Sequence, residues 1–243
     1  MTGPIVNPKA RYWAAYHEVA GDMGLPRVDS GTLWRLVRSG APLGQWVRGA
    51  KPAQIRDFQT RFEEALESDG NIEVQTPQED AAEALVRLCR HGECVLVTAG
   101  VNRPARQVLL DRLDLSVHFA GMRGLPEELQ GRVRVLKELA HGDERVVAAA
   151  GSKGVVHAAH SAGLVVAGIT NGAFVSAWLA RVGASPIFAD LTALADEVES
   201  GAERLIQAGL LPPRHTPVRN PFETPDRAGT SRSRNEYRRD RRC

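Results

Sequence analysis

A hydroxyl, a guanidinium and a glycine-serine pair stand where apolar runs of the sequence end or helices begin. Thr98 closes the run Cys94–Val97, Arg132 opens a later stretch with helical spacing, and Gly151 and Ser152 follow a third apolar run. Hydroxyl and guanidinium groups donate hydrogen bonds to anions, and the guanidinium adds a fixed charge. None of these residues is a carboxylate, a group that commonly takes part in acid–base catalysis and is the usual side-chain ligand for hard metal ions.

Strands and helices alternate over about residues 78–200 and would position these residues. Short continuous apolar runs are typical of strands buried on both faces of a parallel sheet. Alternation with helices implies right-handed crossovers and an α/β fold with a doubly wound parallel sheet, in which ligands bind at the carboxyl ends of the strands. Thr98, Arg132 and Gly151 would lie at or near that edge. We expect helices at 77–90, 104–113, 132–140, 155–162, 173–182 and 191–199, and strands at 94–97, 117–119, 146–150, 164–169 and 186–188.

The first quarter of the chain has a different character, all-helical and rich in aromatic residues. Apolar residues recur at helical spacing over 11–23 and 52–66. Trp13, Trp34 and Trp46 are therefore expected in the core of a small helical unit rather than around a ligand.

Composition limits the class of protein. The 243 residues are 43% hydrophobic and 25% charged, which fits one ordinary globular domain with a smaller insertion. There is no apolar stretch long enough to span a membrane, and no basic flank followed by an apolar block marks a secretory signal. Cys89, Cys94 and Cys243 are too few and too irregularly spaced for a disulfide framework or a zinc site. We expect a cytoplasmic protein without a membrane partner.

The segment after Leu211 is rich in arginine and proline and has almost no apolar residues. Such a composition cannot offset the entropy cost of ordering, so residues 211–243 are predicted to be a disordered basic tail. The tail is either a solvated terminus or a contact for nucleic acid or an acidic partner.

In the order and spacing of its motifs, the sequence resembles the haloacid dehalogenase (HAD-like) superfamily, in particular phosphoglycolate-phosphatase-like members with a helical cap. The resemblance covers roughly residues 3–200. The family's second motif, a strand that ends in Thr or Ser, is similar to Val95–Gly100. Its third motif, in which Lys normally follows Gly, is similar to Gly131-Arg132. Its fourth motif, usually Gly-Asp-Ser-x-x-Asp and then an Ala-Ala helix, is similar to residues 150–163.

The resemblance implies a Rossmann-like core and a phosphate site. It places the core at residues 1–9 and 76–210, lacking the usual first strand, and the helical cap at 10–75. Phosphate would be bound by Thr98, Ala99, Gly100 and Arg132. The alternative is that Thr98 is a turn residue and Arg132 a solvated arginine in the first turn of its helix.

The catalytic and metal-binding positions depart from the family pattern. The nucleophilic aspartate and its strand would precede Met1, and Thr2 takes the place of the second aspartate. Gly151 and Val155 replace the two acids of the fourth motif, so Gly151, Ser152 and Val155 form a degenerate metal site. No metal or other cofactor is expected, except Mg²⁺ if hydrolytic activity is retained. Asp29-Ser30-Gly31-Thr32 imitates the missing motif, but no apolar strand precedes it. His157 and His160 are three residues apart on a helix and are expected on its surface.

The missing first strand has a structural consequence, because that strand lies in the middle of the family's sheet. Either the strands that carry the second and fourth motifs pair directly, or an unpaired edge is left that invites another strand. A protein partner or a second copy of the chain would fill that gap by strand addition.

Three functions remain open from the sequence. The first is a catalytically impaired HAD-like pseudoenzyme that binds a phosphorylated small molecule or a protein partner. The second is a magnesium-dependent phosphomonoester hydrolase whose recorded start is too late. The third is a nucleic-acid-associated protein that uses the basic tail.

Overall fold

Parallel strands form the framework of the core and lie in two separate hydrogen-bonded groups. The computed structural model describes residues 3–100, 102–141 and 146–209; Thr2, Cys243 and the predicted tail lie outside them. The strands are β3 (Val95–Thr98) and β4 (Gly121–Gly124) in one group, and β5 (Ala148–Ala150), β6 (Val166–Ile169) and β7 (Ala184–Phe188) in the other. In the parallel registers, Thr98 faces Gly124 and Ala150 faces Gly168.

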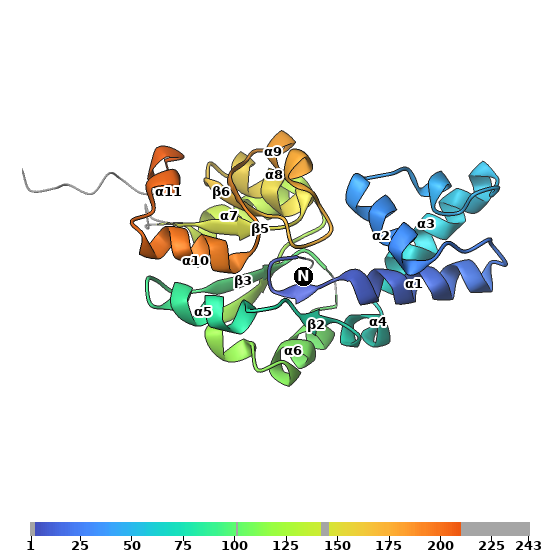
Figure 1. The fold of residues 1–243 in the computed structure, drawn as a ribbon, viewed down its shortest axis with the longest axis horizontal. Helices are drawn as coiled ribbons and strands as arrows, with labels where there is room; N and C mark the ends of the chain where they lie inside the picture. The colour runs from blue at the N-terminus through green and yellow to red at the C-terminus, as the bar shows by residue number, and fades with distance from the viewer. Residues whose placement is uncertain (1–2, 101, 142–145, 210–243) are drawn as a thin grey trace, which may run out of the picture. The chain divides into compact units, whose positions relative to one another are not determined.

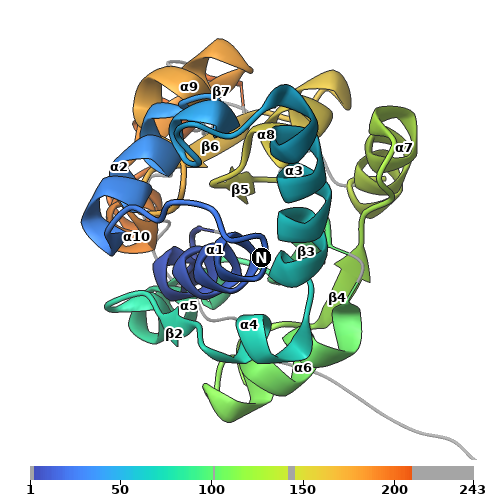
Figure 2. The ribbon, with the colours of Figure 1, turned by 90° about the vertical axis from the view of Figure 1, so that its right-hand side faces the viewer.

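The two groups are not hydrogen-bonded to each other, since among the described residues β3 pairs only with β4 and β5 only with β6. In both perpendicular views the start of the described chain lies beside β3 and β5 (Figures 1 and 2). Direct pairing of the strands carrying the second and fourth motifs is therefore not observed. The α/β fold with parallel strands is confirmed, but the sheet is divided at the place where the family's first strand would stand.

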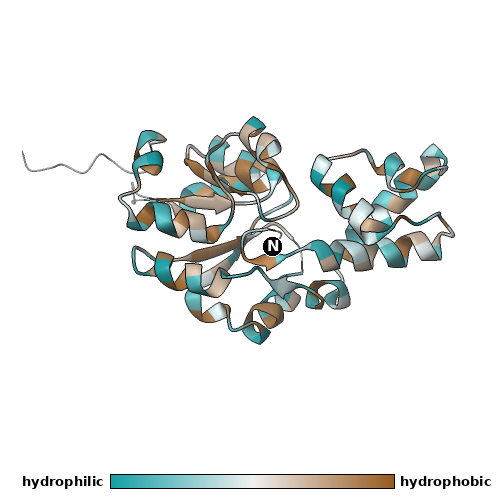
Figure 3. Ribbon diagram, in the orientation of Figure 1, coloured by the Kyte–Doolittle hydropathy of each residue, from teal (hydrophilic) through white to brown (hydrophobic). Residues whose placement is uncertain are grey.

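Helices cover both faces of the strand layer. Apolar residues from helices α5 and α10 meet Leu96 of β3 and Ile169 of β6 in one core cluster, so packing joins the two strand groups. Strand β3 is mostly brown in the hydropathy view, whereas the helices carry both colours (Figure 3). On this face lie α5 (Ala81–Cys89), α6 (Arg103–Arg112), α10 (Leu191–Glu199) and α11 (Glu203–Gln207); on the other lie α7 (Leu129–Leu139), α8 (Lys153–Ser161) and α9 (Ser176–Arg181).

The N-terminal helical segment has its own core. Its aromatic residues pack edge to face or stacked, as in the pairs Phe58–Phe62 and Trp46–Phe62. Trp46 is buried, and Trp13 and Trp34 are partly buried against the same cluster, as expected. The segment contains α1 (Lys9–Asp22), α2 (Ser30–Ser39), a short 3₁₀ turn η1 (Leu43–Gln45), α3 (Pro52–Leu66) and α4 (Asp69–Glu73).

A two-residue antiparallel ladder holds together the two ends of this segment. In β1 (Val6–Asn7) and β2 (Thr76–Pro77), Val6 faces Pro77 and Asn7 faces Thr76. The Gln78 N–H extends the ladder by donating to the Ile5 carbonyl at 2.9 Å. The chain therefore leaves the core and returns to it at one place.

One expected element is wrong. Residues 117–119 are not a strand; they belong largely to a 3₁₀ turn, η2 (Ser116–His118), and the strand follows at β4. The expected bounds of helices 52–66 and 191–199 are confirmed, and other helices and strands differ by a few residues at their ends. None of the helices in the described residues combines the length and apolar character needed to cross a membrane.

Candidate functional site

Thr98 and Arg132 are connected through the chain that follows β4. Thr98 ends β3 and is 1% exposed, and its carbonyl accepts a 2.7 Å hydrogen bond from the Leu125 N–H. One residue further, the Pro126 carbonyl accepts a 2.7 Å hydrogen bond from Nε of Arg132. Two hydrogen bonds therefore place Arg132, in the first turn of α7, at the carboxyl edge where β3 and β4 end.

The Arg132 guanidinium extends from α7 to the first turn of α8. A Cβ atom at Gly154 would lie 2.6 Å from Nη1 of Arg132, so only glycine allows this approach without displacing the arginine. Lys153 stands in the same turn, and Ser152 precedes it as the helix N-cap without a side-chain capping bond. Because a helix N-terminus carries partial positive charge, these cations gather where the backbone already favours an anion.

Lys153 is held by an aromatic residue that also contacts the helical segment. Its Nζ atom lies 3.6 Å from the centre of the Trp178 ring, within the range of a cation–π interaction. The indole Nε1 of Trp178 donates to the Ser39 carbonyl at 3.2 Å. Gly40 packs on the same ring, with 3.1 Å between its ideal Cβ position and the indole carbons. Trp178 therefore links the first turn of α8 to the end of α2.

Gly151 occupies a position with little room for a side chain. Its ideal Cβ would lie 3.1 Å from the Ile169 carbonyl oxygen, 3.1 Å from Cδ of Pro4 and 3.3 Å from Cα of Gly3. Gly172 approaches Gly3 more closely than Gly151 does, since the ideal Cβ of Gly172 would lie 2.5 Å from Cα of Gly3. The backbone of Gly3 and the ring of Pro4 therefore fill the space beside the fourth motif.

The degenerate metal site does not fit Mg²⁺. Hard divalent cations need several oxygen ligands, usually carboxylates, whereas Gly151 brings backbone only and the Val155 side chain packs in an apolar cluster. Among residues 3–100, 102–141 and 146–209, no group of three or more His, Cys, Asp or Glu side chains is placed to hold a metal ion. Thr2 lies outside these residues.

The loop after Thr98 is backed by a buried arginine that the sequence did not reveal. A Cβ atom at Gly100 would lie within 1.9 Å of Nη2 of Arg106, so the guanidinium rests directly on the glycine backbone. Arg106 is 1% exposed, and Ala99 packs partly into the apolar cluster below the loop. Gly100 therefore gives the guanidinium of Arg106 room beneath the loop.

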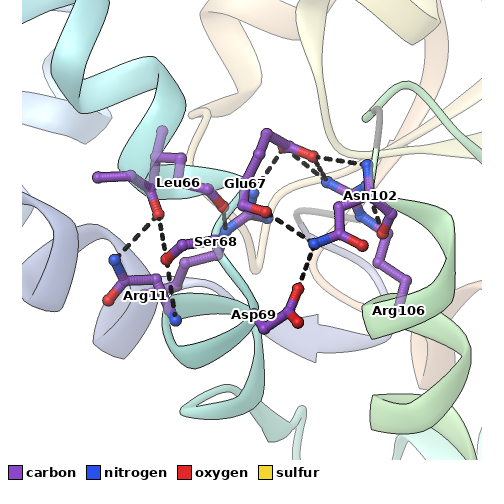
Figure 4. Close-up of polar contacts among 9 residues, drawn as sticks. Arg11, Leu66, Glu67, Ser68, Asp69, Asn102 and Arg106 are labelled. Atoms are coloured by element: carbon purple, nitrogen blue, oxygen red, sulfur yellow. Dashed lines mark hydrogen bonds and ion pairs between the residues drawn. The ribbon is translucent and has the colours of Figure 1, made fainter.

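Glu67 neutralises this arginine and links it to the helical segment (Figure 4). Its two carboxylate oxygens accept hydrogen bonds from Nη2 of Arg106 at 2.6 and 2.7 Å, and one also accepts from Nη2 of Arg11 at 2.7 Å. The amide of Asn102, the N-cap of α6, donates to the Glu67 carbonyl at 2.9 Å and to Asp69 at 2.5 Å. One carboxylate thus joins α1, the end of α3 and α6.

Burial and charge act in opposite directions on this network. Burial raises the pKa of Glu67, but the hydrogen bond from Arg106 and the charges of Arg106 and Arg11 outweigh it and hold the pKa below its usual value. Burial lowers the pKa of Arg11, and Glu67 opposes that effect. The carboxylate is therefore charged over the physiological range, and its pairing keeps two buried guanidinium groups neutralised.

The structure gives Asp29, His157 and His160, the other residues that resemble parts of catalytic or metal-binding motifs, ordinary structural positions. Asp29 is the N-cap of α2, and its Oδ1 accepts a 2.9 Å hydrogen bond from the Thr32 N–H. His157 and His160 are both exposed on α8, and the His160 ring packs against Gly183. None of the three residues points to catalysis.

Solved structures provide the comparison, since no family model and no curated protein matches the sequence. A haloacid dehalogenase-like family hydrolase from Streptococcus pneumoniae has a TM-score of 0.64 at 16% identity, covering 82% of this chain and 94% of that one. A predicted phosphatase from Clostridium acetobutylicum has a TM-score of 0.63 at 12% identity, covering 82% and 95%. A predicted phosphoglycolate phosphatase from Haemophilus somnus has a TM-score of 0.58 at 19% identity, covering 81% and 94%. The chain therefore has the haloacid dehalogenase-like fold that its motifs predict.

Proposed function

We propose that the chain binds a phosphorylated small molecule at the carboxyl edge of its strands and does not hydrolyse it. The observation that supports this proposal is the gathering of Arg132 and Lys153 at the N-terminus of α8 without an ion pair to any described carboxylate. A phosphate group would relieve the repulsion between these cations and the helix N-terminus.

The same edge supplies donors for a phosphomonoester. Among the described residues, the two Nη groups of Arg132 have no hydrogen-bond acceptor, whereas Nε donates to the Pro126 carbonyl. The N–H groups of the first turn of α8 have no partner within the helix, as at every helix N-terminus. The predicted phosphate ligands Thr98, Ala99 and Gly100 line the neighbouring strand end and complete the proposed site.

Hydrolysis is disfavoured by what fills the place of the acids. The chemistry of this fold needs a carboxylate nucleophile and carboxylates that hold Mg²⁺. Beside Gly151, the nearest atoms are the Ile169 carbonyl oxygen, the Pro4 ring and the Gly3 backbone. The proposed role is therefore that of a sensor or carrier.

Calorimetric titration of the full chain with inorganic phosphate and with 2-phosphoglycolate, with and without Mg²⁺, tests this function. We expect saturable binding, no release of inorganic phosphate from 2-phosphoglycolate, and a loss of affinity of about 10- to 100-fold in Arg132→Ala. Arg134→Ala is the matched control, because Arg134 lies on the same helix with a side chain 75% exposed. Phosphate release above background would favour the hydrolase instead, and absence of binding at millimolar ligand would make the proposal wrong.

The divided strand layer favours a second candidate, self-association by strand addition. Strand β3 is bonded only to β4, and β5 only to β6, so each has one unpaired edge within the described residues. Val95 is 40% exposed and Ala149 is exposed, which is unusual for the inner strands of a parallel sheet. A strand from a second copy of the chain would satisfy both edges.

Light scattering and amide hydrogen exchange at increasing protein concentration test this candidate. We expect the dimer fraction and the protection of β3 and β5 amides to rise together. Ala149→Lys should abolish both, because a lysine on an edge strand blocks pairing. A monomer at all concentrations, or a dimer with unchanged exchange in β3 and β5, would rule it out.

A further inference from the structure

Two thiols face each other where α5 ends and β3 begins. Cys89 is the last residue of α5, and Cys94 directly precedes β3. Their Sγ atoms are 3.0 Å apart, and both are free, half-buried thiols. The irregular spacing that argued against a disulfide framework in the sequence thus brings one pair together in the fold.

Backbone structure on three elements holds the two sulfur atoms in place. The Cys94 carbonyl accepts a 2.9 Å hydrogen bond from the Ala120 N–H, which extends the β3–β4 register by one residue. The Cys89 thiol donates to the His118 carbonyl of η2 at 3.2 Å. The turn after α5 begins with a 2.9 Å bond from the His91 N–H to the Leu88 carbonyl. The pair is therefore set by secondary structure rather than by chance in a loose loop.

We propose that Cys89 and Cys94 are a redox modification site that closes to a reversible disulfide. A disulfide bond is about 2.05 Å long, so the sulfur atoms need to approach by only about 1 Å. Residues 90–93, which connect the two cysteines, are all exposed, so small oxidants have access from solvent.

The reaction balances with hydrogen peroxide as the oxidant. The Cys89 thiolate attacks one peroxide oxygen, the O–O bond breaks, and a sulfenic acid forms while hydroxide leaves as water. The Cys94 sulfur then attacks the Cys89 sulfur, the S–O bond breaks, and a second water leaves. Two thiols lose two electrons and two protons to one peroxide. Oxidised glutathione gives the same disulfide through a mixed disulfide and releases two glutathione thiols.

The environment supports different roles for the two sulfurs. Burial, followed by the neighbouring Cys89 thiol, raises the pKa of the Cys94 thiol to about 12. Since the thiolate is the attacking species, Cys94 enters second, losing its proton as the disulfide closes. The rate of closure therefore rises with pH.

Peptide mapping by mass spectrometry tests the proposal on the full chain. The substitution Cys243→Ser removes the third cysteine, which lies outside the described residues. The variant, which keeps only the thiols of Cys89 and Cys94, is then equilibrated in glutathione buffers of stepped potential. We expect a mass loss of about 2 Da without an increase in oligomer. Trypsin cleaves after Arg87 and Arg90, so the disulfide would link peptide 88–90 to peptide 91–106. Dithiothreitol should restore both thiols.

Single variants separate closure of the pair from ordinary oxidation. In the Cys243→Ser background, Cys89→Ser and Cys94→Ser should each show no 2 Da loss. Cys94→Ser should instead trap a mixed glutathione disulfide on Cys89, and Cys89→Ser should form one on Cys94 more slowly, because burial keeps the Cys94 thiol protonated. The proposal is overturned if both thiols of the Cys243→Ser chain stay alkylatable in oxidised glutathione while the fold is intact by circular dichroism. It is equally overturned if each cysteine carries a separate glutathione.

Discussion

Lys153 Nζ lies over the Trp178 ring, 3.6 Å from its centre, and the same indole donates its N–H to the Ser39 carbonyl. One aromatic side chain thus contacts both the cation at the start of α8 and the end of α2. A substitution that disturbs this contact should therefore change both the free energy of unfolding and anion binding at the proposed site.

Gly40→Ala is expected to weaken the contact between α2 and Trp178. Gly40 has a φ of 66°, and its ideal Cβ lies 3.1 Å from the indole, so alanine adds steric conflict to backbone strain. Gly49→Ala is the matched control, because Gly49 has a φ of 83° with open space around it. Urea unfolding should show a loss of about 1 kcal/mol for Gly49→Ala and about 1 kcal/mol more for Gly40→Ala. Equal losses would mean that the Trp178 contact contributes nothing.

Glu67→Gln should be among the most destabilising single polar changes in the chain. The change leaves the side chains of Arg11 and Arg106, 3% and 2% exposed, without a counter-charge. A loss of about 2–4 kcal/mol in the free energy of unfolding is expected, since removing one partner exposes the full cost of the buried charge. Glu64→Gln on the exposed side of α3 is the control and should change stability by less than about 0.5 kcal/mol.

The stability of the protein should depend on pH through the same carboxylate. The pKa of Glu67 is lower in the folded chain than in the unfolded one, because Arg106 and Arg11 favour its charged form despite burial. Its contribution is therefore complete above the unfolded pKa, about 4.3, and is lost as pH falls through the lower folded value. Melting temperatures measured from pH 7 to pH 3 should fall more steeply for the wild type than for Glu67→Gln. Parallel curves would show that Glu67 is not coupled to folding in this way.

Restoring an acid at Gly151 should not restore a metal site. Gly151→Asp places a side chain against the Ile169 carbonyl and Pro4, at an expected cost of about 1–3 kcal/mol from overpacking. Gly151→Ala separates this steric cost from the effect of the charge. Mg²⁺ at millimolar concentration should not raise the melting temperature of either variant, because the nearest atoms to an ideal Cβ at position 151 belong to Ile169, Pro4 and Gly3 and none is a carboxylate oxygen. A rise with Mg²⁺ in Gly151→Asp alone would contradict this account.

Sequence patterns identified the elements in which apolar side chains recur at the spacing of a buried face. The helix Pro52–Leu66 repeats apolar residues at helical spacing, and its bounds were predicted correctly. Strand β4 was missed because Gly121 and Gly124 supply no side-chain pattern. Its place is set by the register with β3 and by the bond from Ala120 to Cys94. The position of β4 is therefore determined by its pairing with a distant strand, which a local sequence pattern does not contain.

The candidate site was predictable only in part, for a similar reason. Thr98 and Arg132 follow recognisable motifs, so their places along the chain could be named in advance. Glu67 and Arg106 are 39 residues apart, and each alone has the pattern of an ordinary surface charge on a helix. Only the fold shows that Gly100 makes room for the Arg106 guanidinium and that Glu67 neutralises it.

Asn7 and Thr76 are paired residues of the β1–β2 ladder, and most of the chain between them is an excursion with its own aromatic core, apart from Ile72, which packs in the cluster of the strand layer. Facing residues of an antiparallel pair are about 5 Å apart, a distance that a two-residue hairpin spans. The helical segment is therefore topologically removable: a short turn could replace it without rerouting any core strand. The same geometry makes it exchangeable for a segment that supplies Arg106 with another counter-charge in place of Glu67, and such a substitution would change the specificity for a ligand without rerouting the strand layer.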